Sequence, residues 1–105
     1  MIKVLALIVY LTSFLTLNVY AGFDEDIAAI NKGMPKLIKL FNLRQIECNH
    51  WANEEPTDKE RFKQINAAIT KLRCNNLEKD EVKLLKKYKS RNDIVKSINL
   101  AKEFI

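Results

Sequence analysis

Apolar residues recur at helical spacing through the centre of the chain. Steps of three and four residues separate Phe62, Ile65, Ile69 and Leu72. This spacing places the four side chains on one face of an α-helix and leaves the lysines between them on the other face. The preceding residues 57–60 (Thr-Asp-Lys-Glu) fit a capping box, in which the first and last side chains satisfy each other's backbone N–H groups. We therefore predict an amphipathic helix that begins after Thr57.

Two further helices are predicted after residue 76, where Asn75 and Asn76 suit a helix end and restart. The first has acidic residues at its start and lysines towards its end, the order that the helix dipole favours. Its candidate buried residues are Val82, Leu84, Leu85 and Tyr88. The second follows a possible N-cap over residues 90–93 and places one apolar face inward. That face consists of Ile94, Ile98, Ala101 and Ile105.

The segment before the first cysteine is denser in apolar residues. Within residues 36–48 they are Leu37, Ile38, Leu40, Phe41, Leu43 and Ile46. So many apolar positions leave no single stripe, and we expect a helix that is buried on more than one side. A short helix over residues 24–32 should precede it and end at Gly33 in a left-handed conformation, and Pro35 should open the next one. Residues 49–56 interrupt the pattern and predict a connector.

The fold class follows from these segments. The sequence has only 2 Gly and 2 Pro, and it lacks the alternating β-branched runs that announce hairpins. No internal repeat or low-complexity linker is present. We predict an all-α fold, a small bundle of four to five short helices, in a single domain over residues 22–105.

The first 21 residues have the features of a signal peptide. Lys3 is followed by an apolar run from Val4 to Leu17, which is shorter than the roughly 20 residues of a transmembrane helix. The run leads to Val-Tyr-Ala at residues 19–21, which predicts cleavage between Ala21 and Gly22 and a periplasmic or secreted product. The alternative is an uncleaved anchor over residues 2–21.

Both cysteines, Cys48 and Cys74, follow the predicted cleavage site. Export to an oxidising compartment favours a disulfide between them, which would stabilise a domain too small to bury a large core. The alternative, two unpaired structural thiols, applies mainly if the chain is not exported. Their spacing is unlike the Cys-x-x-Cys of redox enzymes.

The connector between the predicted helices has the most unusual composition of the chain. Its candidate binding residues are His50, Trp51, Asn53, Glu54 and Glu55. In one interpretation Trp51 is mostly buried beside the disulfide and the polar residues face water. In the other, the bridge at Cys48 holds a binding loop rigid. We expect burial of Trp51 first and recognition second.

The chain is basic, with a formal net charge of +5, and Lys3 is the only charged residue before Gly22. A basic cluster consists of Lys83, Lys86, Lys87, Lys89 and Arg91. Its simplest interpretation is the solvated face of a helix. If it is functional, an anionic membrane, a cell-wall polymer or an acidic protein suits an exported chain better than nucleic acid does.

Catalytic and metal-binding patterns are not recognisable. His50 is the only histidine, and with Glu54 or Glu55 it offers two ligands where a metal site needs three or four. No nucleophile has an identifiable histidine and acid partner, and there is no glycine-rich phosphate loop. We predict no enzyme, no metal and no cofactor.

One set of spaced residues resembles small exported bacterial proteins of unknown function. These have a Cys-x-x-Trp-x-x-Glu core, then Arg and Ile in a helix, and a second Cys. The matching residues here are Cys48, Trp51, Glu54, Arg61, Ile65 and Cys74, within residues 48–101. The resemblance implies export and a structural disulfide but no activity. In size and helical style alone, the chain is also similar to periplasmic immunity and lysozyme-inhibitor proteins.

Two functions remain open from the sequence, beside a purely structural role in the cell envelope. Export, small size and the lack of catalytic groups favour a protein-binding module of the cell envelope, such as an inhibitor or immunity factor against an envelope-acting enzyme. The alternative is a cationic secreted effector that binds anionic membrane or cell-wall surfaces.

Overall fold

A computed structural model describes residues 24–105 of the chain, so the predicted signal peptide over residues 1–21 lies outside the described residues. The chain divides between Ile30 and Asn31 into two compact units. The second unit contains helices α2 (Lys36–Asn53), α3 (Lys59–Lys71), α4 (Leu77–Lys87) and α5 (Asn92–Glu103), with a 3₁₀ turn, η1 (Cys74–Asn76), before α4. Residues 24–105 contain helices and no strand, which confirms the all-α prediction.

The breaks before α2 follow the sequence prediction. Residues 24–31 are helical, and Gly33 has a φ angle of 73°, the left-handed conformation that glycine adopts without a steric penalty. Pro35 then caps α2, which begins at Lys36. The predicted roles of Gly33 and Pro35 are confirmed.

Helix α2 is longer than predicted, because it continues through Cys48 to Asn53. Residues 49–53 contain neither Gly nor Pro, and the first helix-breaking residue is Pro56. Proline disfavours helical geometry at the residue before it, here Glu55, and the helix ends just before that point. The connector is therefore much shorter than the predicted residues 49–56.

The caps of α3 and α5 also differ from the prediction. Asp58, rather than Thr57, is the N-cap of α3, and its side chain accepts a hydrogen bond of 2.8 Å from the backbone N–H of Arg61. A carboxylate at this position also interacts favourably with the helix dipole, which explains why it replaces the hydroxyl. The N-cap position of α5 is Arg91, which makes no side-chain cap bond, so the predicted cap over residues 90–93 is not formed.

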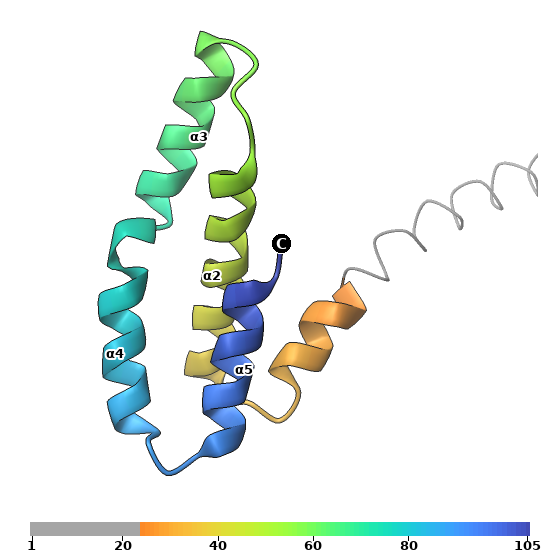
Figure 1. Cartoon of the computed structure of the whole chain (residues 1–105), viewed down its shortest axis with the longest axis vertical. Coiled ribbons are helices and arrows are strands. Elements are labelled where there is room, and N and C mark those ends of the chain that lie inside the picture. The colour runs from red at the N-terminus through yellow and green to blue at the C-terminus, as the bar shows by residue number, and fades with distance from the viewer. Residues whose placement is uncertain (1–23) are drawn as a thin grey trace, which may run out of the picture. The chain divides into compact units, whose positions relative to one another are not determined.

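The other three helices, α3, α4 and α5, are arranged around α2 (Figure 1). Helix α5 and helix α3 each contact α2 directly, and α3 leads through η1 into α4 along one side of it. The buried cluster combines residues from α2, α4 and α5. Its members are Ile38, Phe41, Cys48, Leu77, Leu84, Ile94 and Ile98. The core therefore lies where α2, α4 and α5 meet.

Several residues predicted to be buried are exposed. Val82 is 48% exposed on α4, where Leu84 is the buried residue of the predicted set. Ile105 is 89% exposed because α5 ends at Glu103, two residues earlier. Phe62 is 53% exposed in the first turn of α3, towards the end of the α2–α3 hairpin that extends past α5 in Figure 1. The rest of the predicted α5 face is confirmed, since Ile94, Ile98 and Ala101 are fully buried.

Two asparagines of α2 fix the position of α5. The buried amide of Asn42 donates to the hydroxyl of Ser97 at 2.9 Å and to the side-chain oxygen of Asn31 at 2.9 Å. The amide of Asn49 donates to backbone carbonyls at the end of α5, at 3.0 Å from Ala101 and 2.8 Å from Phe104. The Ala101 carbonyl also accepts the backbone N–H of Phe104 at 3.3 Å, so Asn49 adds to the C-terminal cap of α5 from another helix.

Candidate functional site

The predicted binding loop is mostly helical. His50, Trp51 and Asn53 belong to the end of α2, and only Glu54 and Glu55 lie in the connection to α3. The side chain of His50 is 66% exposed. The prediction of a loop held by the disulfide is therefore wrong for three of the five candidate residues.

Trp51 forms a cluster with residues on both sides of the α2–α3 connection. The guanidinium of Arg61 lies 5.2 Å from the centre of the Trp51 ring, and His50 meets the ring edge-on at 5.3 Å. Arg61 also forms an ion pair with Glu54. Trp51 is neither fully buried nor exposed, and Arg61 lies over its ring, whereas Phe62, which was expected to cover it, is itself exposed. The cluster closes the α2–α3 hairpin and has the form of a structural contact.

The half-buried position of Trp51 sets the expected cost of removing it. We expect Trp51→Ala to lower the free energy of unfolding by about 1–2 kcal/mol, below the 3–5 kcal/mol typical of a fully buried tryptophan. Thermal unfolding with the disulfide intact measures this, with His50→Ala as a control that leaves stability unchanged. A loss above about 3 kcal/mol for Trp51→Ala would show that the ring is part of the core.

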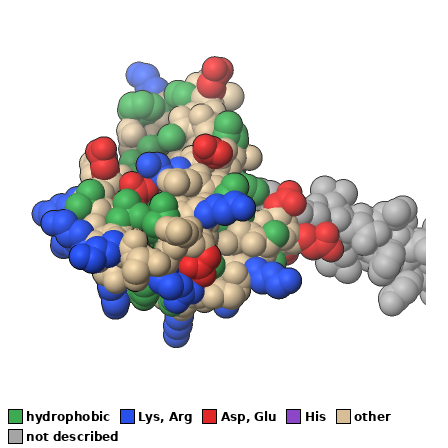
Figure 2. Space-filling model, turned by 60° about the horizontal axis from the view of Figure 1, so that its bottom comes forward, with side chains coloured by type: hydrophobic (Ala, Val, Ile, Leu, Met, Phe, Trp, Pro, Cys, Tyr) green, Lys and Arg blue, Asp and Glu red, His purple; other side chains and the backbone are tan. Residues whose placement is uncertain are grey.

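The predicted basic cluster is exposed throughout but is not one helix face. Lys83, Lys86 and Lys87 lie on α4, whereas Lys89 and Arg91 follow the end of that helix. Arg91 forms an ion pair with Asp93 at 2.8 Å. Figure 2 shows Lys and Arg side chains gathered on the side of the molecule that α4 occupies in Figure 1.

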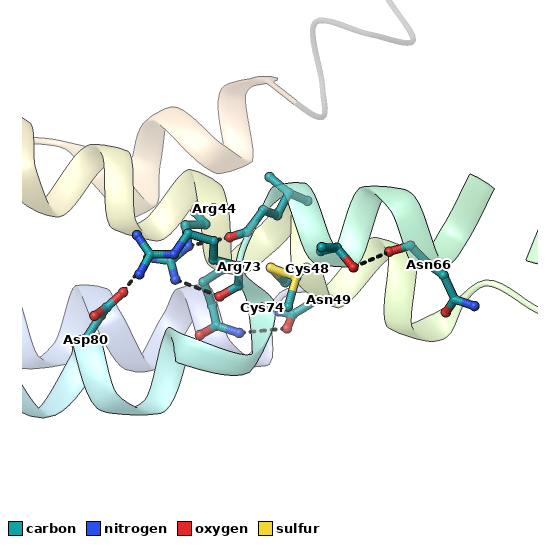
Figure 3. The surroundings of a disulfide bond; sticks show 10 residues. Arg44, Cys48, Asn49, Asn66, Arg73, Cys74 and Asp80 are labelled. Carbon is teal, nitrogen blue, oxygen red and sulfur yellow. Dashed lines mark hydrogen bonds and ion pairs between the residues drawn. A yellow bond between two sulfur atoms is a disulfide. The ribbon is translucent and has the colours of Figure 1, made fainter. Parts of the chain in front are cut away.

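The disulfide prediction is confirmed. Cys48 and Cys74 are bonded, with their Cα atoms 5.7 Å apart (Figure 3). Cys48 is buried in α2, and Cys74 begins η1, so the bond connects α2 to the segment that enters α4. It therefore closes the whole α2–α3 hairpin.

Arg44 connects the same elements one helical turn earlier (Figure 3). Its guanidinium donates to the backbone carbonyls of Leu72 at 2.7 Å and Arg73 at 2.8 Å, which follow the end of α3. It also forms an ion pair of 2.8 Å with Asp80 of α4. The hydrogen bond from Arg44 lowers the pKa of Asp80, so the carboxylate stays charged. Arg44 thus joins α2, α3 and α4.

An apolar hollow of about 330 Å³ lies between α2 and α4, beside Arg44. It is lined by Leu37, Leu40, Phe41, Arg44, Asp80, Lys83 and Leu84. Phe41 and Leu84 are buried, whereas Leu37 is 46% and Leu40 is 56% exposed. Two of the leucines predicted to be buried are therefore on the surface.

A second hollow, of about 390 Å³, continues along α2 on the other side of Arg44. It is lined by Leu40, Leu43, Arg44, Glu47, Lys71, Leu72 and Arg73. Leu43 is 37% exposed, the third leucine of α2 that the sequence predicted as buried. The two hollows share Leu40 and Arg44, so they form one surface along α2 from Leu37 to Glu47, which we call the α2 groove.

The charges of the α2 groove are mainly positive. Arg44, Lys71, Arg73 and Lys83 are part of its lining, against Asp80 and Glu47. Asp80 is already paired with Arg44. Single exposed leucines are common on protein surfaces, but a row of them in a hollow marks a candidate contact site.

Comparisons with known proteins give no relative. No protein-family model, curated protein or solved structure matches the chain. Within residues 24–105, no helix is both long and apolar enough to cross a membrane, and no group of three His, Cys, Asp or Glu side chains is placed to hold a metal ion. The resemblance built on Cys48 and Trp51 stays an expectation from the sequence.

Sequence reasoning missed the α2 groove and the role of Arg44. The leucines at positions 37, 40 and 43 have a spacing of three, which could have indicated a second apolar stripe on α2 beside the core stripe of Ile38 and Phe41. No sequence signal identifies Arg44, because its partners are backbone carbonyls and an acid 36 residues away.

Proposed function

We propose that this chain is an exported, non-catalytic protein-binding module that contacts its partner through the α2 groove. The observation that carries the proposal is the exposure of three leucines in one hollowed surface, at positions 37, 40 and 43. Exposed apolar surface of this kind is costly in water unless a partner covers it. These leucines are not part of the core, and a contact with a partner would account for their exposure.

A rigid groove supports this proposal, because a preformed surface loses little conformational entropy on binding. Two connections hold the walls of the groove together. Arg44 spans α2, α3 and α4, and the disulfide fixes the chain just beyond the groove. The leucines are thus presented on helices with fixed positions.

The cell envelope is the proposed compartment, and an inhibitor or immunity factor against an envelope enzyme is the proposed role. The predicted signal peptide and the disulfide at Cys48 support export, since disulfides persist mainly in oxidising compartments. The small size and the binding surface support inhibition over catalysis. Intact-mass analysis of the exported protein should find Gly22 at the N-terminus.

Affinity capture from the envelope fraction tests the proposed function. We expect the parent protein to retain one protein partner in stoichiometric amount and the variant Leu40→Glu to lose it, because a charge would be placed in the apolar contact. Leu100→Glu is the matched control, since Leu100 is 43% exposed on α5 and does not line the groove. Equal recovery by both variants, or recovery of lipid alone, would contradict the proposal.

The second candidate function is attachment to anionic surfaces, which the exposed lysines of α4 favour. Salt-sensitive attachment to anionic vesicles that depends on Lys83 and Lys86, and not on Leu40, would support it over protein binding.

A further inference from the structure

The dimensions of the α2 groove indicate the size of its occupant. The groove follows α2 from Leu37 to Glu47, which at 1.5 Å per residue corresponds to about 15 Å. A partner helix of about three turns has this length.

The surroundings of the groove restrict how a partner can bind. Residues 24–105 contain no strand, so this part of the chain offers no sheet edge to which an extended peptide could add. Proline-rich peptides prefer grooves lined with aromatic rings, whereas the exposed apolar lining here is leucine and the one aromatic residue, Phe41, is buried. A hollow between helices with leucine walls fits the apolar stripe of an amphipathic helix.

The charge of the groove indicates the polar side of that helix. Lys83 of α4 is exposed and lines the first hollow, and Lys71 and Arg73, at the end of α3, line the second. Lys87 follows Lys83 by one helical turn, so it extends this positive edge. Because Asp80 is paired with Arg44, the remaining charges of the lining are Lys71, Arg73 and Lys83 against Glu47. Acidic residues on a partner would therefore meet a net positive edge.

We propose that the α2 groove binds an acidic amphipathic helix of the partner protein. This inference rests on the proposed function and adds the chemistry of the partner segment. The partner helix places apolar side chains at i, i+3 or i+4 and i+7 against Leu37, Leu40 and Leu43, and its Asp or Glu residues lie beside Lys71 and Lys83. A flat membrane would fill the hollow less well than a convex helix does.

The described part of the chain also has a short acidic helical segment ahead of α2. Residues 24–31 carry Asp24, Glu25 and Asp26, followed by Ile27 and Ile30. This segment spans only about 12 Å and offers two branched apolar anchors, fewer than the groove accommodates. A second copy of the chain is therefore a poorer occupant, and its binding is one of the outcomes that the test distinguishes.

A designed peptide provides the test. The probe is a capped peptide of about 14 residues with leucines at i, i+3, i+4 and i+7 and glutamates on its other face. One comparison peptide has lysine in place of every glutamate, and another has the acidic sequence scrambled. Binding to the intact, oxidised protein is followed by fluorescence anisotropy, and the contact surface is mapped by amide chemical shifts.

We expect the acidic peptide to bind at least tenfold more tightly than either comparison peptide. Its binding should change the amide chemical shifts of residues in α2 and α4. Leu40→Glu should weaken binding at least tenfold, whereas Leu100→Glu should leave it unchanged. Lys83→Glu should weaken binding of the acidic peptide and strengthen binding of the lysine peptide. Added salt should reduce both changes.

The inference is overturned if the three peptides bind equally, if Leu100→Glu weakens binding as much as Leu40→Glu, or if shifts fall outside the groove. It is also overturned if sedimentation shows a dimer that Leu40→Glu dissolves, or if anionic vesicles alone bind through Leu40. Failure of the acidic probe while envelope capture still depends on Leu40 would remove this inference and leave the proposed function intact. Loss of that dependence would remove the proposed function itself.

Discussion

Replacing Cys48 and Cys74 with alanine should lower the free energy of unfolding by about 3.5 kcal/mol, the largest effect that we expect from any change in this chain. The bond joins residues that are 26 apart in sequence. Without it the unfolded chain gains conformational entropy, and for a loop of this length the gain corresponds to the stated free energy. A small helical domain has few other sources of stability, so most of its margin should be lost.

Urea unfolding of the oxidised, reduced and Cys48→Ala/Cys74→Ala proteins measures this effect. The reduced protein and the double variant should unfold at similar, much lower urea concentrations. Because the bond lies just beyond Leu43 and Glu47, its loss should also weaken binding at the groove in conditions where the domain remains folded. A double variant as stable as the oxidised parent would show that packing alone holds α2 to η1.

The second largest effect is expected for Arg44→Ala. Its guanidinium is the observed partner of two backbone carbonyls, those of Leu72 and Arg73, at the end of α3. Hydrogen bonds from a charged group are stronger than neutral ones, and loss of the two carbonyl bonds should lower the free energy of unfolding by about 2–3 kcal/mol. The groove should lose its shape as well, since Arg44 lines both of its hollows.

Two comparisons separate these effects of Arg44. Arg91→Ala removes an exposed arginine that pairs only with Asp93 in the described ion pairs, and its melting temperature should match that of the parent. Arg44→Lys keeps the charge near Asp80 but lacks the planar fork, so its stability should fall between those of the parent and Arg44→Ala. A melting temperature for Arg44→Ala equal to that of Arg91→Ala would contradict the assigned role.

The pH dependence of stability should also change in Arg44→Ala. Arg44 lowers the pKa of Asp80 below its ordinary value of 3.8. The folded state therefore holds the proton less tightly than the unfolded state, so this contribution is present above about pH 4 and is lost as the pH falls through the lowered pKa. Urea unfolding, repeated from neutral pH downwards, measures this effect. The free energy of unfolding should fall less on acidification in Arg44→Ala than in the parent.

The parts of the fold that the sequence predicted are those with a local cause. Gly33 ends a helix because of its own backbone freedom, and the spacing of Ile94, Ile98 and Ala101 sets the buried face of α5. The disulfide followed from the cysteine count together with the predicted export.

The remaining features depend on which helices become neighbours. Periodicity does not say whether an apolar face meets another helix. It could therefore not distinguish Ile38, which is fully buried in the core, from Leu40, which lines a hollow at the surface. The end of α2 depended on Pro56 rather than on the polar residues before it. The ring of Trp51 is contacted by Arg61, whereas Phe62, the expected contact, is exposed. These are tertiary effects, which override local preference.

The central claim is that the α2 groove is the surface through which this chain contacts another protein. Site-specific photo-crosslinking in cells that export the chain tests it most directly, with the photoreactive residue at position 40 and, separately, at position 100. We predict one discrete protein adduct from position 40, lost in the presence of Leu37→Glu, and none from position 100. Adducts of equal yield from both positions, or no protein adduct from position 40, would contradict the claim.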